Sequence, residues 1–396
     1  MNLARVLLSA TLLLTPAAPS MAQQAPCGGD FSGWIAGVRA EAVRAGHDAG
    51  TVDAFFASAR QDARVLKADR SQGVFRKTFL DFSRSLISDS RMKNGKAAAG
   101  RYAPVFQRMQ ADYGISPGLI SAFWGFETDF GQVQGDFNTL NALVTLAHDC
   151  RRPDLFRPQL LAALTLYESG DFEPATTTGA WAGEVGMVQM LPRDILERGV
   201  DGDGDGRITL KTSVPDALLS GASMLSSFGW QPNQPWMQEV VVPAGLDWAQ
   251  TGLDRDLPVG QWAAMGVEGR NGPLARGLSG AILLPQGRKG PAFIVYPNFR
   301  VLFEWNKSFV YVTTAAYFAT RLEGAPPYDA GSPDPALSAD QMVVLQKKLA
   351  ALGHDVGKID GILGAATRRA VQSEQVRLGL AADAWPTREL LAGLKR

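Results

Sequence analysis

Helical periodicity dominates the first part of the chain. From Phe31 to about Arg108, apolar residues recur at intervals of three and four among Ala and Arg residues, as in amphipathic helices. These apolar positions include Val65, Phe75, Phe79, Phe82 and Leu86. Helical signals continue through residues 117–230. We therefore expect a main body built from helices.

The pattern changes between residues 231 and about 300. Pro, Gly and Trp become more frequent, and the runs VVVP and AFIVYP have the character of short strands. A last helical pattern, SFVYVTTAAYFATRL, follows. The sequence thus predicts a mainly α fold (α+β) with a small β portion.

A segment rich in Pro, Gly and Asp, residues 323–337, is typical of a flexible interdomain linker. Beyond it, Ser338 can cap one helix and Thr387 another. The first of these helices has an apolar face formed by Met342, Leu345, Leu349 and Leu352. We expect residues 338–394 to form a small three-helix module on a flexible tether.

Residues 1–22 have the pattern of an export signal. Arg5 supplies a positive start, VLLSATLLL an apolar core, and SMA a small-x-small end with cleavage after Ala22. The apolar run is too short to span a bilayer, and no other run predicts a transmembrane segment. Cys27 lacks the leucine three residues earlier that a lipoprotein signal requires. We expect a soluble exported protein without a lipid anchor, periplasmic if the source is Gram-negative.

Charge and cysteine content narrow the functional classes. Lys and Arg number 39, as do Asp and Glu, so no excess of positive charge favours nucleic acid or an anionic membrane as a partner. Cys27 and Cys150 are the only cysteines. An oxidising compartment favours one disulfide between them, with two free thiols as the alternative. Two cysteines and three histidines argue against a zinc site.

The stretch FWGFETDFG, residues 123–131, places Glu127 among aromatic side chains. Ser116 suits an N-cap, Pro117 a first helical position and Gly131 a C-terminal stop, so Glu127 should lie near the end of a helix. Its face of that helix is expected to carry Phe123, Trp124 and Phe130.

These surroundings disfavour the charged form of Glu127. Apolar neighbours and the negative end of the helix dipole both act against the anion, and no Arg or Lys stands at helical contact spacing. A carboxyl that stays neutral near pH 7 can donate the proton that cleavage of a glycosidic bond requires. The alternative is a glutamate whose head group reaches the surface or a buried partner, and the helix alone does not separate the two.

Two other stretches carry side chains suited to a sugar. In AWAGEVGMVQMLP, residues 180–192, Gln189 offers both a donor and an acceptor, although a tight packing corner explains this stretch better when it is taken alone. In NFRVLFEWNKSFVYV, Trp305, Asn306 and Tyr311 supply aromatic faces and an amide. An amphipathic core segment accounts equally well for Trp305 and Tyr311.

The run DGDGDGRITL has the beginning of a calcium-binding loop. Asp201, Asp203 and Asp205 alternate with glycine and offer hard oxygen ligands. Position twelve is Thr212 instead of Glu, and Asp216 is the nearest acid that could close the site. We favour a structural Ca²⁺ over a solvated acidic turn, and we expect no organic cofactor.

In combination and in order, FWGFETDFG, AWAGEVGMVQMLP, DGDGDGRI with SVPDALLSGASML, and NFRVLFEWNKS resemble the lytic murein transglycosylase B family over roughly residues 30–322. The resemblance implies a lysozyme-like catalytic core with added helical and small β portions. It also implies cleavage of the β-1,4 bond between N-acetylmuramic acid and N-acetylglucosamine in peptidoglycan, with formation of 1,6-anhydromuramoyl ends.

The same resemblance assigns roles by position. Glu127 falls on the single catalytic acid/base. The substrate-binding positions are Gln189, Asn306, Tyr311, Trp305 and Trp181. The calcium ligands are Asp201, Asp203, Asp205, Asp216 and the carbonyl of Arg207. Ala180 stands where the family often has Ser, and Trp305 where it often has Tyr, so a hydroxyl that makes a polar contact is missing.

Residues 338–394 resemble the type 1 peptidoglycan-binding domain, through VVLQKKLAALGHDVGKIDGILGAATRRAVQSEQ and GLAADAWPTRELLAGL. SEQ and DAWPT depart from the usual endings of this pattern. The partners implied are peptidoglycan glycan strands, bound by a monomer. A hydrolytic muramidase that yields reducing ends and a non-catalytic wall-binding scaffold are the alternatives.

Overall fold

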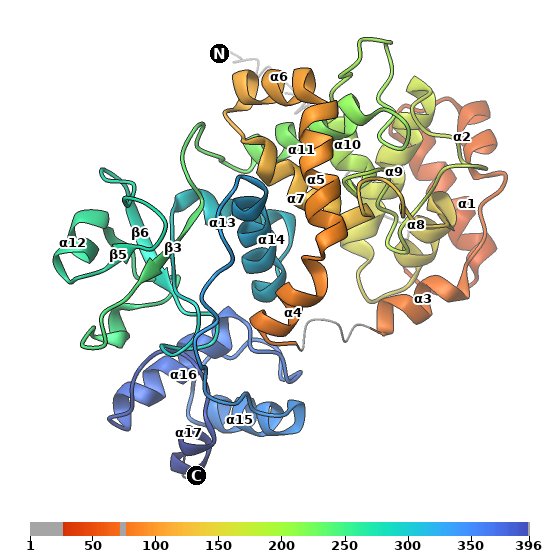
Figure 1. Cartoon of the computed structure of the whole chain (residues 1–396). Coiled ribbons are helices and arrows are strands. Elements are labelled where there is room, and N and C mark those ends of the chain that lie inside the picture. The colour runs from red at the N-terminus through yellow and green to blue at the C-terminus, as the bar shows by residue number, and fades with distance from the viewer. Residues whose placement is uncertain (1–26, 72–76, 395–396) are drawn as a thin grey trace, which may run out of the picture.

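The computed structural model describes residues 27–71 and 77–394. The predicted export signal and Phe75 lie outside these ranges. Within them the protein is mainly helical, with one five-stranded sheet and a separate helical module at the C-terminal end (Figure 1). The predicted fold class is confirmed.

One group of helices, at the right of Figure 1, forms a lobe around α8 and α9. Asp30, Asp48 and Asp62 each accept a backbone N–H at the start of one of its first three helices, which fixes where these helices begin. The lobe consists of α1 Phe31–Arg44, α2 Ala49–Phe56, α3 Ala63–Arg70, α8 Thr139–His148 and α9 Pro153–Ser169.

A disulfide between Cys27 and Cys150 closes this lobe. The two Cα atoms lie 5.2 Å apart, and the bond joins the residues before α1 to those after α8. The backbone N–H of Gly28 donates to the carbonyl of His148 beside it, at 2.8 Å. The structure therefore contains the disulfide that we favoured over two free thiols.

The centre of the molecule is formed by α7 and α14, which pack against each other. The residues of α7 from Gly118 to Gly125 are all buried, as expected of a helix that is apolar all round. The pair is α7 Pro117–Thr128 and α14 Phe309–Leu322. Around it lie α4 Phe79–Leu86, α5 Asp89–Arg101, α6 Ala103–Tyr113, α11 Val214–Ser227 and α13 Pro297–Trp305, and α10 Pro192–Arg198 packs against α9 and α11.

The strands form an antiparallel sheet in the order β4-β6-β7-β3-β5. In β6 and β7, Leu283 and Phe293 face the main core, whereas Ile282 and Ile294 pack with Trp262 of α12 in a second, smaller core. The elements are β3 Met237–Val241, β4 Leu257–Pro258, α12 Val259–Ala264, β5 Glu268–Gly269, β6 Ser279–Leu283 and β7 Phe293–Val295. A separate pair, β1 Phe137–Asn138 and β2 Thr178–Gly179, lies beside α8.

The C-terminal module contains the three expected helices, α15 Ala339–Ala351, α16 Ala365–Arg377 and α17 Arg388–Gly393. Ser338 forms a reciprocal capping box with Gln341, and Thr387 caps α17. One predicted core position is wrong: Leu352 is 41% exposed, because α15 ends one residue earlier and Leu352 is its C-cap.

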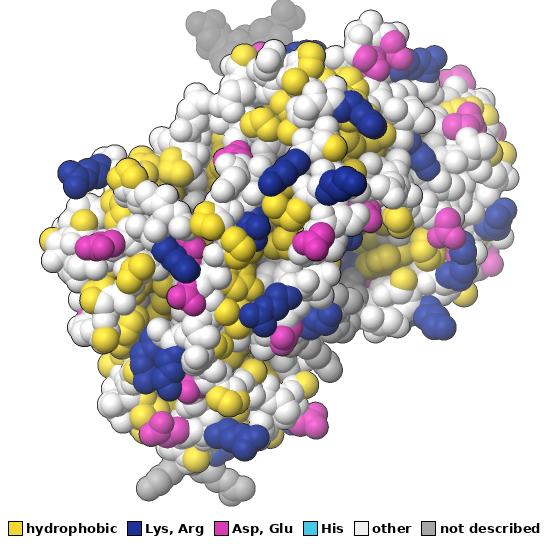
Figure 2. All heavy atoms as spheres, in the orientation of Figure 1, with side chains coloured by type: hydrophobic (Ala, Val, Ile, Leu, Met, Phe, Trp, Pro, Cys, Tyr) yellow, Lys and Arg dark blue, Asp and Glu magenta, His cyan; other side chains and the backbone are white. Residues whose placement is uncertain are grey.

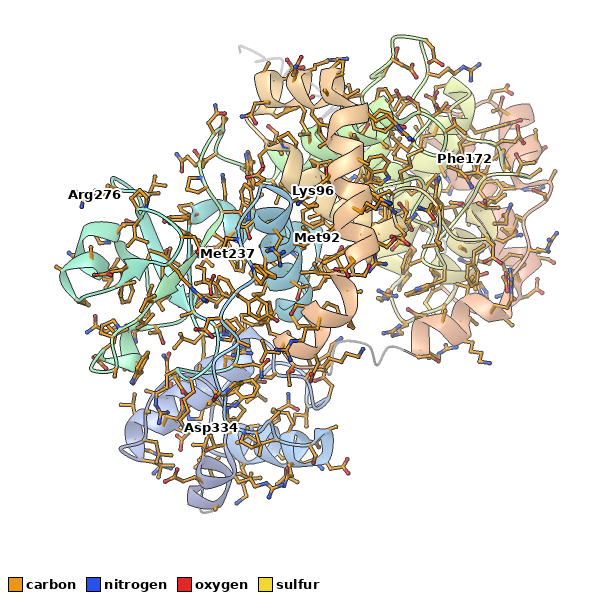
Figure 3. The ribbon with its side chains drawn as sticks, in the orientation of Figure 1. Met92, Lys96, Phe172, Met237, Arg276 and Asp334 are labelled. Carbon is orange, nitrogen blue, oxygen red and sulfur yellow. A yellow bond between two sulfur atoms is a disulfide. The ribbon has the colours of Figure 1, made fainter. Side chains whose placement is uncertain are left out.

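Residues 323–337 are not a free tether. The backbone N–H of Tyr328 donates to the Tyr317 hydroxyl at 3.1 Å, and that of Ser332 donates to the carbonyl of Lys289 at 2.8 Å. The carbonyl of Asp334, which is labelled among the module's helices in Figure 3, accepts from the indole N–H of Trp385 at 3.0 Å. This polar segment finds hydrogen-bond partners on both bodies, which argues against the expected flexibility.

The module is also bonded directly to the β part. The Gln372 amide donates to the carbonyls of Trp248 and Thr251, at 3.1 and 2.9 Å. Arg368 donates to the carbonyl of Pro285 at 2.7 Å and lies over the ring of Phe309 at 4.2 Å. Burial of this guanidinium lowers the pKa of Arg368 to about 9.

Two surface properties bear on function. Figure 2 shows Lys and Arg side chains interspersed with Asp and Glu over the visible face, as the balanced charge implies. Among the described residues, no helix combines the length and the apolar character needed to cross a membrane.

Candidate active site

Glu127 is the penultimate residue of α7, whose end has an unusual backbone. Asp129 and Phe130 both adopt left-handed conformations, with φ of 52° and 61°, and they bond back to the carbonyls of Gly125 and Trp124. The helix therefore ends before the predicted stop at Gly131. Phe130 follows the helix instead of sharing its face, and it packs edge-on against Trp124 at 5.4 Å.

The carboxyl group of Glu127 is held by two donors from distant parts of the chain. Its Oε1 accepts hydrogen bonds from the Tyr311 hydroxyl at 2.5 Å and from the Trp305 indole N–H at 3.1 Å. Burial raises the pKa of Glu127, and these two bonds oppose the rise in part. Burial thus disfavours the Glu127 anion, as predicted. The alternative, a glutamate whose head group has buried partners, is also realised, because Tyr311 and Trp305 both bond to it.

The two donors are themselves well fixed. Tyr311 lies in the first turn of α14, is 7% exposed, and burial raises its pKa well above the ordinary value, so it stays a phenol that donates. Trp305 is the last residue of α13 and stacks on Phe123 with ring centroids 4.3 Å apart. Its indole N–H supplies a donor at the position where the resemblance indicated a missing hydroxyl.

Of the other predicted substrate residues, Gln189 and Trp181 lie in turns, and Asn306 is the C-cap of α13 with an extended backbone. Gln189 has φ of 55°, and its amide donates to the carbonyl of Gly186 at 2.7 Å, so it also stabilises the tight corner that contains it. The Asn306 side chain accepts from the backbone N–H of Ser308 at 2.9 Å. Trp305 and Asn306 line a cavity of about 630 Å³ beside the C-terminal module. Trp181 is half-buried under the guanidinium of Arg152.

The loop of residues 180–191 is bonded to the end of α7. The Thr128 hydroxyl, next to Glu127 in sequence, donates to the carbonyl of Met187 at 2.6 Å. This contact brings a residue that sequence reasoning missed, Glu184, into electrostatic range of Glu127. Burial first, and then the charge of Glu127, raise the pKa of Glu184 to about 7.

The sequence held one signal for Glu184. It is the only acidic residue in AWAGEVGMVQMLP, an otherwise uncharged run. Its relation to Glu127 depends on how a loop folds onto a helix end, and no periodicity reports such a contact.

The acidic loop brings three carboxylates together. Oxygen atoms of Asp201, Asp203 and Asp205 lie within 4.8 Å of one another, a donor set that suits Ca²⁺. Asp216 is not a member of this group. Its two oxygens accept backbone N–H bonds from Gly202 at 2.9 Å and Thr209 at 2.7 Å, so it braces the loop from inside.

Arg207 takes part in the same loop through its other groups. Its backbone N–H donates to Asp205 at 2.9 Å, and its guanidinium donates to the carbonyl of Gly170. These bonds tie the acidic loop to the end of α9.

The main body and the C-terminal module each match a known protein family. Residues 30–320 match the family described as a transglycosylase SLT domain, and residues 338–394 match a peptidoglycan binding domain. The chain is 28% identical over 233 residues to the membrane-bound lytic murein transglycosylase B of Escherichia coli K12, a match that covers 58% of this chain. It spans 63% of that relative's length, less than two thirds.

Solved structures extend the similarity to the module. The crystal structure of SltB3 from Pseudomonas aeruginosa in complex with NAG-anhNAM-pentapeptide is 37% identical, with a TM-score of 0.85, and the match covers 93% of this chain and 100% of that one. The E. coli lytic transglycosylase Slt35 in complex with calcium is 25% identical, with a TM-score of 0.64 and coverage of 78% and 98%. The expected lysozyme-like core is confirmed by these matches.

Proposed function

The chain belongs to the lytic murein transglycosylase B family of SLT-domain proteins, and from this premise we propose that it cleaves the β-1,4 bond between N-acetylmuramic acid and N-acetylglucosamine in peptidoglycan, leaving 1,6-anhydromuramoyl ends. The observation that carries the proposal is the Glu127 carboxyl, buried at a helix end and, within residues 27–71 and 77–394, bonded only through Oε1 to Tyr311 and Trp305. A relative bound to an anhydromuramoyl peptide supports the same product.

In the first step Glu127 acts as an acid. Both donors bond to Oε1, which leaves Oε2 to hold the proton. Burial keeps that proton in place until the glycosidic oxygen, leaving as the 4-hydroxyl of N-acetylglucosamine, takes it. The 2-acetamido group of the substrate assists at the anomeric carbon.

In the second step the same group acts as a base. The Tyr311 hydroxyl and the Trp305 N–H stabilise the Glu127 anion once the proton has left. The carboxylate then removes the proton of the muramoyl 6-hydroxyl, whose oxygen closes on the anomeric carbon. Because this nucleophile belongs to the substrate, its high effective concentration lets it outcompete water.

The variant Glu127→Gln tests this mechanism. We expect it to keep the fold and to release no soluble muropeptides from purified sacculi, since an amide neither donates the proton nor accepts it later. Mass spectrometry of the wild-type digest should show products one water lighter than hydrated muropeptides. Hydrated, reducing ends would show a muramidase instead, and co-sedimentation with sacculi without any soluble product would show a wall-binding scaffold.

We further propose that residues 338–394 bind the cell wall and that Ca²⁺ binds at Asp201, Asp203 and Asp205, where it would stabilise the loop beside α11. The family match of the module and the converging carboxylates support these two assignments. Ca²⁺ in complex with Slt35 supports the metal. Export to the periplasm, as a monomer that contacts glycan strands, is proposed from the sequence pattern of residues 1–22 and from the substrate.

A further inference from the structure

We propose that the cavity between the core and the C-terminal module binds the short acidic peptide carried by the muramoyl sugar, and that lysines from both bodies bind its carboxylates. The inference rests on the proposed function and deepens it, because it names the part of the substrate that is recognised beyond the glycosidic bond.

This cavity begins beside the candidate active site. It has a volume of about 630 Å³, in the range of small-ligand sites, and its walls come from the start of α4, the turn between α13 and α14, and the module. Trp305 lines it and also donates its indole N–H to Oε1 of Glu127, at 3.1 Å. A ligand whose sugar lies against Glu127 therefore has room to continue between the two bodies.

The charged side chains that line the cavity are all cationic. They are Lys77 and Lys307 of the core and Lys358 and Arg368 of the module, and the described lining residues include no Asp or Glu. The chain as a whole has as many acidic as basic residues, so composition does not account for this local excess. Because walls of one charge concentrate ligands of the opposite charge, the cavity favours an anion.

Two of these cations are available to a ligand. The side chains of Lys77 and Lys358 are exposed and have no ion-pair partner within residues 27–71 and 77–394. Lys307, by contrast, pairs with Glu304 at 2.7 Å. Arg368 donates to a backbone carbonyl, but its Nε is shielded from solvent and has no hydrogen-bond partner in the described part of the chain. Each body thus contributes one unpaired ammonium group to the cavity.

The apolar part of the lining narrows the kind of anion. Phe79, Phe309, Met342, Ile362 and Trp385 are among the lining residues. In peptidoglycan the glycan backbone is uncharged, whereas the peptide joined to the lactyl group of N-acetylmuramic acid carries carboxylates and the methyl groups of alanine. Ammonium groups pair with the carboxylates, and the apolar surface accepts the methyl groups. Of the two parts of the proposed substrate, the peptide is the one that matches this lining.

The test compares two sets of soluble glycan strands as substrates. In one set the peptides keep free carboxyl groups, and in the other these groups are converted to amides; free amines are acetylated in both. The measurement is kcat/KM for release of anhydromuropeptides. Because exposed ion pairs contribute little each, we expect wild type to prefer the free-carboxyl strands by about three- to tenfold. Salt screens such pairs, so the preference should fall toward unity in about 0.5 M NaCl.

The double variant Lys77→Gln, Lys358→Gln removes the two unpaired charges. We expect its preference to fall below about twofold, through loss of activity on the free-carboxyl strands. The matched control is Lys67→Gln, Lys347→Gln, which removes one exposed lysine from α3 and one from α15, neither of which lines the cavity. The control should keep the wild-type preference.

The outcomes are separable. A wild type that releases no anhydromuropeptides from either set refutes the proposed function itself. An active wild type with equal rates on the two sets refutes the peptide site. A preference that the double variant retains, including one retained through an equal loss on both sets, places recognition elsewhere and refutes it as well. A preference that the control loses shows attraction by net charge alone. Should the double variant fail to fold, Lys358→Gln decides by the same ratio.

Discussion

The Tyr311 hydroxyl lies 2.5 Å from Oε1 of Glu127, across the contact between α14 and α7. The two residues are 184 positions apart, yet this bond sets the chemistry of the site. It opposes the effect of burial, which raises the Glu127 pKa, and under the proposed mechanism this balance would let the carboxyl donate a proton and accept one afterwards.

Tyr311→Phe should therefore slow the reaction and change its pH dependence. Loss of the donor raises the Glu127 pKa further, so the alkaline limb should move to higher pH. The anion formed during the reaction also loses a bond, for which we expect a fall in kcat of about ten- to a hundredfold. Steady-state kinetics from pH 4 to about pH 9 would measure both effects. Tyr113→Phe, at the end of α6, is the control; an unshifted limb in Tyr311→Phe contradicts the assigned bond.

The disulfide should make a large contribution to stability. It closes a loop with a sequence separation of 123, for which the chain-entropy model gives about 4–5 kcal/mol. We expect Cys150→Ser to lower the free energy of unfolding by up to this amount in denaturant titrations, with activity retained under native conditions. Reductant should lower the stability of the wild type and leave the variant unchanged. Equal sensitivity of both proteins to reductant would speak against the pairing.

Removal of calcium should destabilise the protein without abolishing catalysis, because the acidic loop lies outside the Glu127 site. At a hundredfold excess of Ca²⁺ over Kd, linkage predicts a gain of about 3 kcal/mol, visible as a chelator-sensitive Tm. Asp205→Asn should remove most of this sensitivity, because it takes one carboxylate from the metal site. The amide oxygen that remains can still accept the N–H of Arg207, so the loop should keep this hydrogen bond. A wild-type Tm that does not respond to chelator or to added Ca²⁺ contradicts the site.

Residues 323–337 should resist proteolysis in the native protein. Trp385→Ala removes the indole that donates to Asp334 and that packs against Gly287, so it should expose this segment to rapid cleavage. Mass spectrometry of fragments after brief digestion with a broad-specificity protease would locate the cuts. Leu352→Ala, at an exposed position in the same module, is the control, and equal cleavage of wild type and Trp385→Ala would show that the segment is not held.

Local signals predicted much of this structure. Ser338 and Thr387 begin helices through the cap hydrogen bonds that their chemistry indicates, whereas Ser116 is the N-cap residue of α7 without a side-chain cap bond. Burial of Glu127 does raise its pKa, as its apolar neighbours predicted. The end of α7 was placed too late, because Asp129 adopts the left-handed conformation that was assigned to Gly131. Asp adopts that conformation more often than most non-glycine residues, but far less often than Gly, so Gly131 was the stronger signal.

The relations between distant segments were beyond prediction. That Trp305 donates to Glu127, and that Glu184 lies within its electrostatic range, depend on how α13 and a loop fold onto α7. The same holds for the linker of residues 323–337: its composition describes the isolated segment, and its partners on Tyr317 and Lys289 appear only after folding.

The bonds between the linker, the module and the β part have a consequence for the proposed reaction. They attach the module to the core through Trp385, Gln372 and Arg368. A module that binds the wall in this arrangement would present glycan strands to Glu127 from one direction only, so the glycosidic bonds within reach would be those at one distance from the bound site.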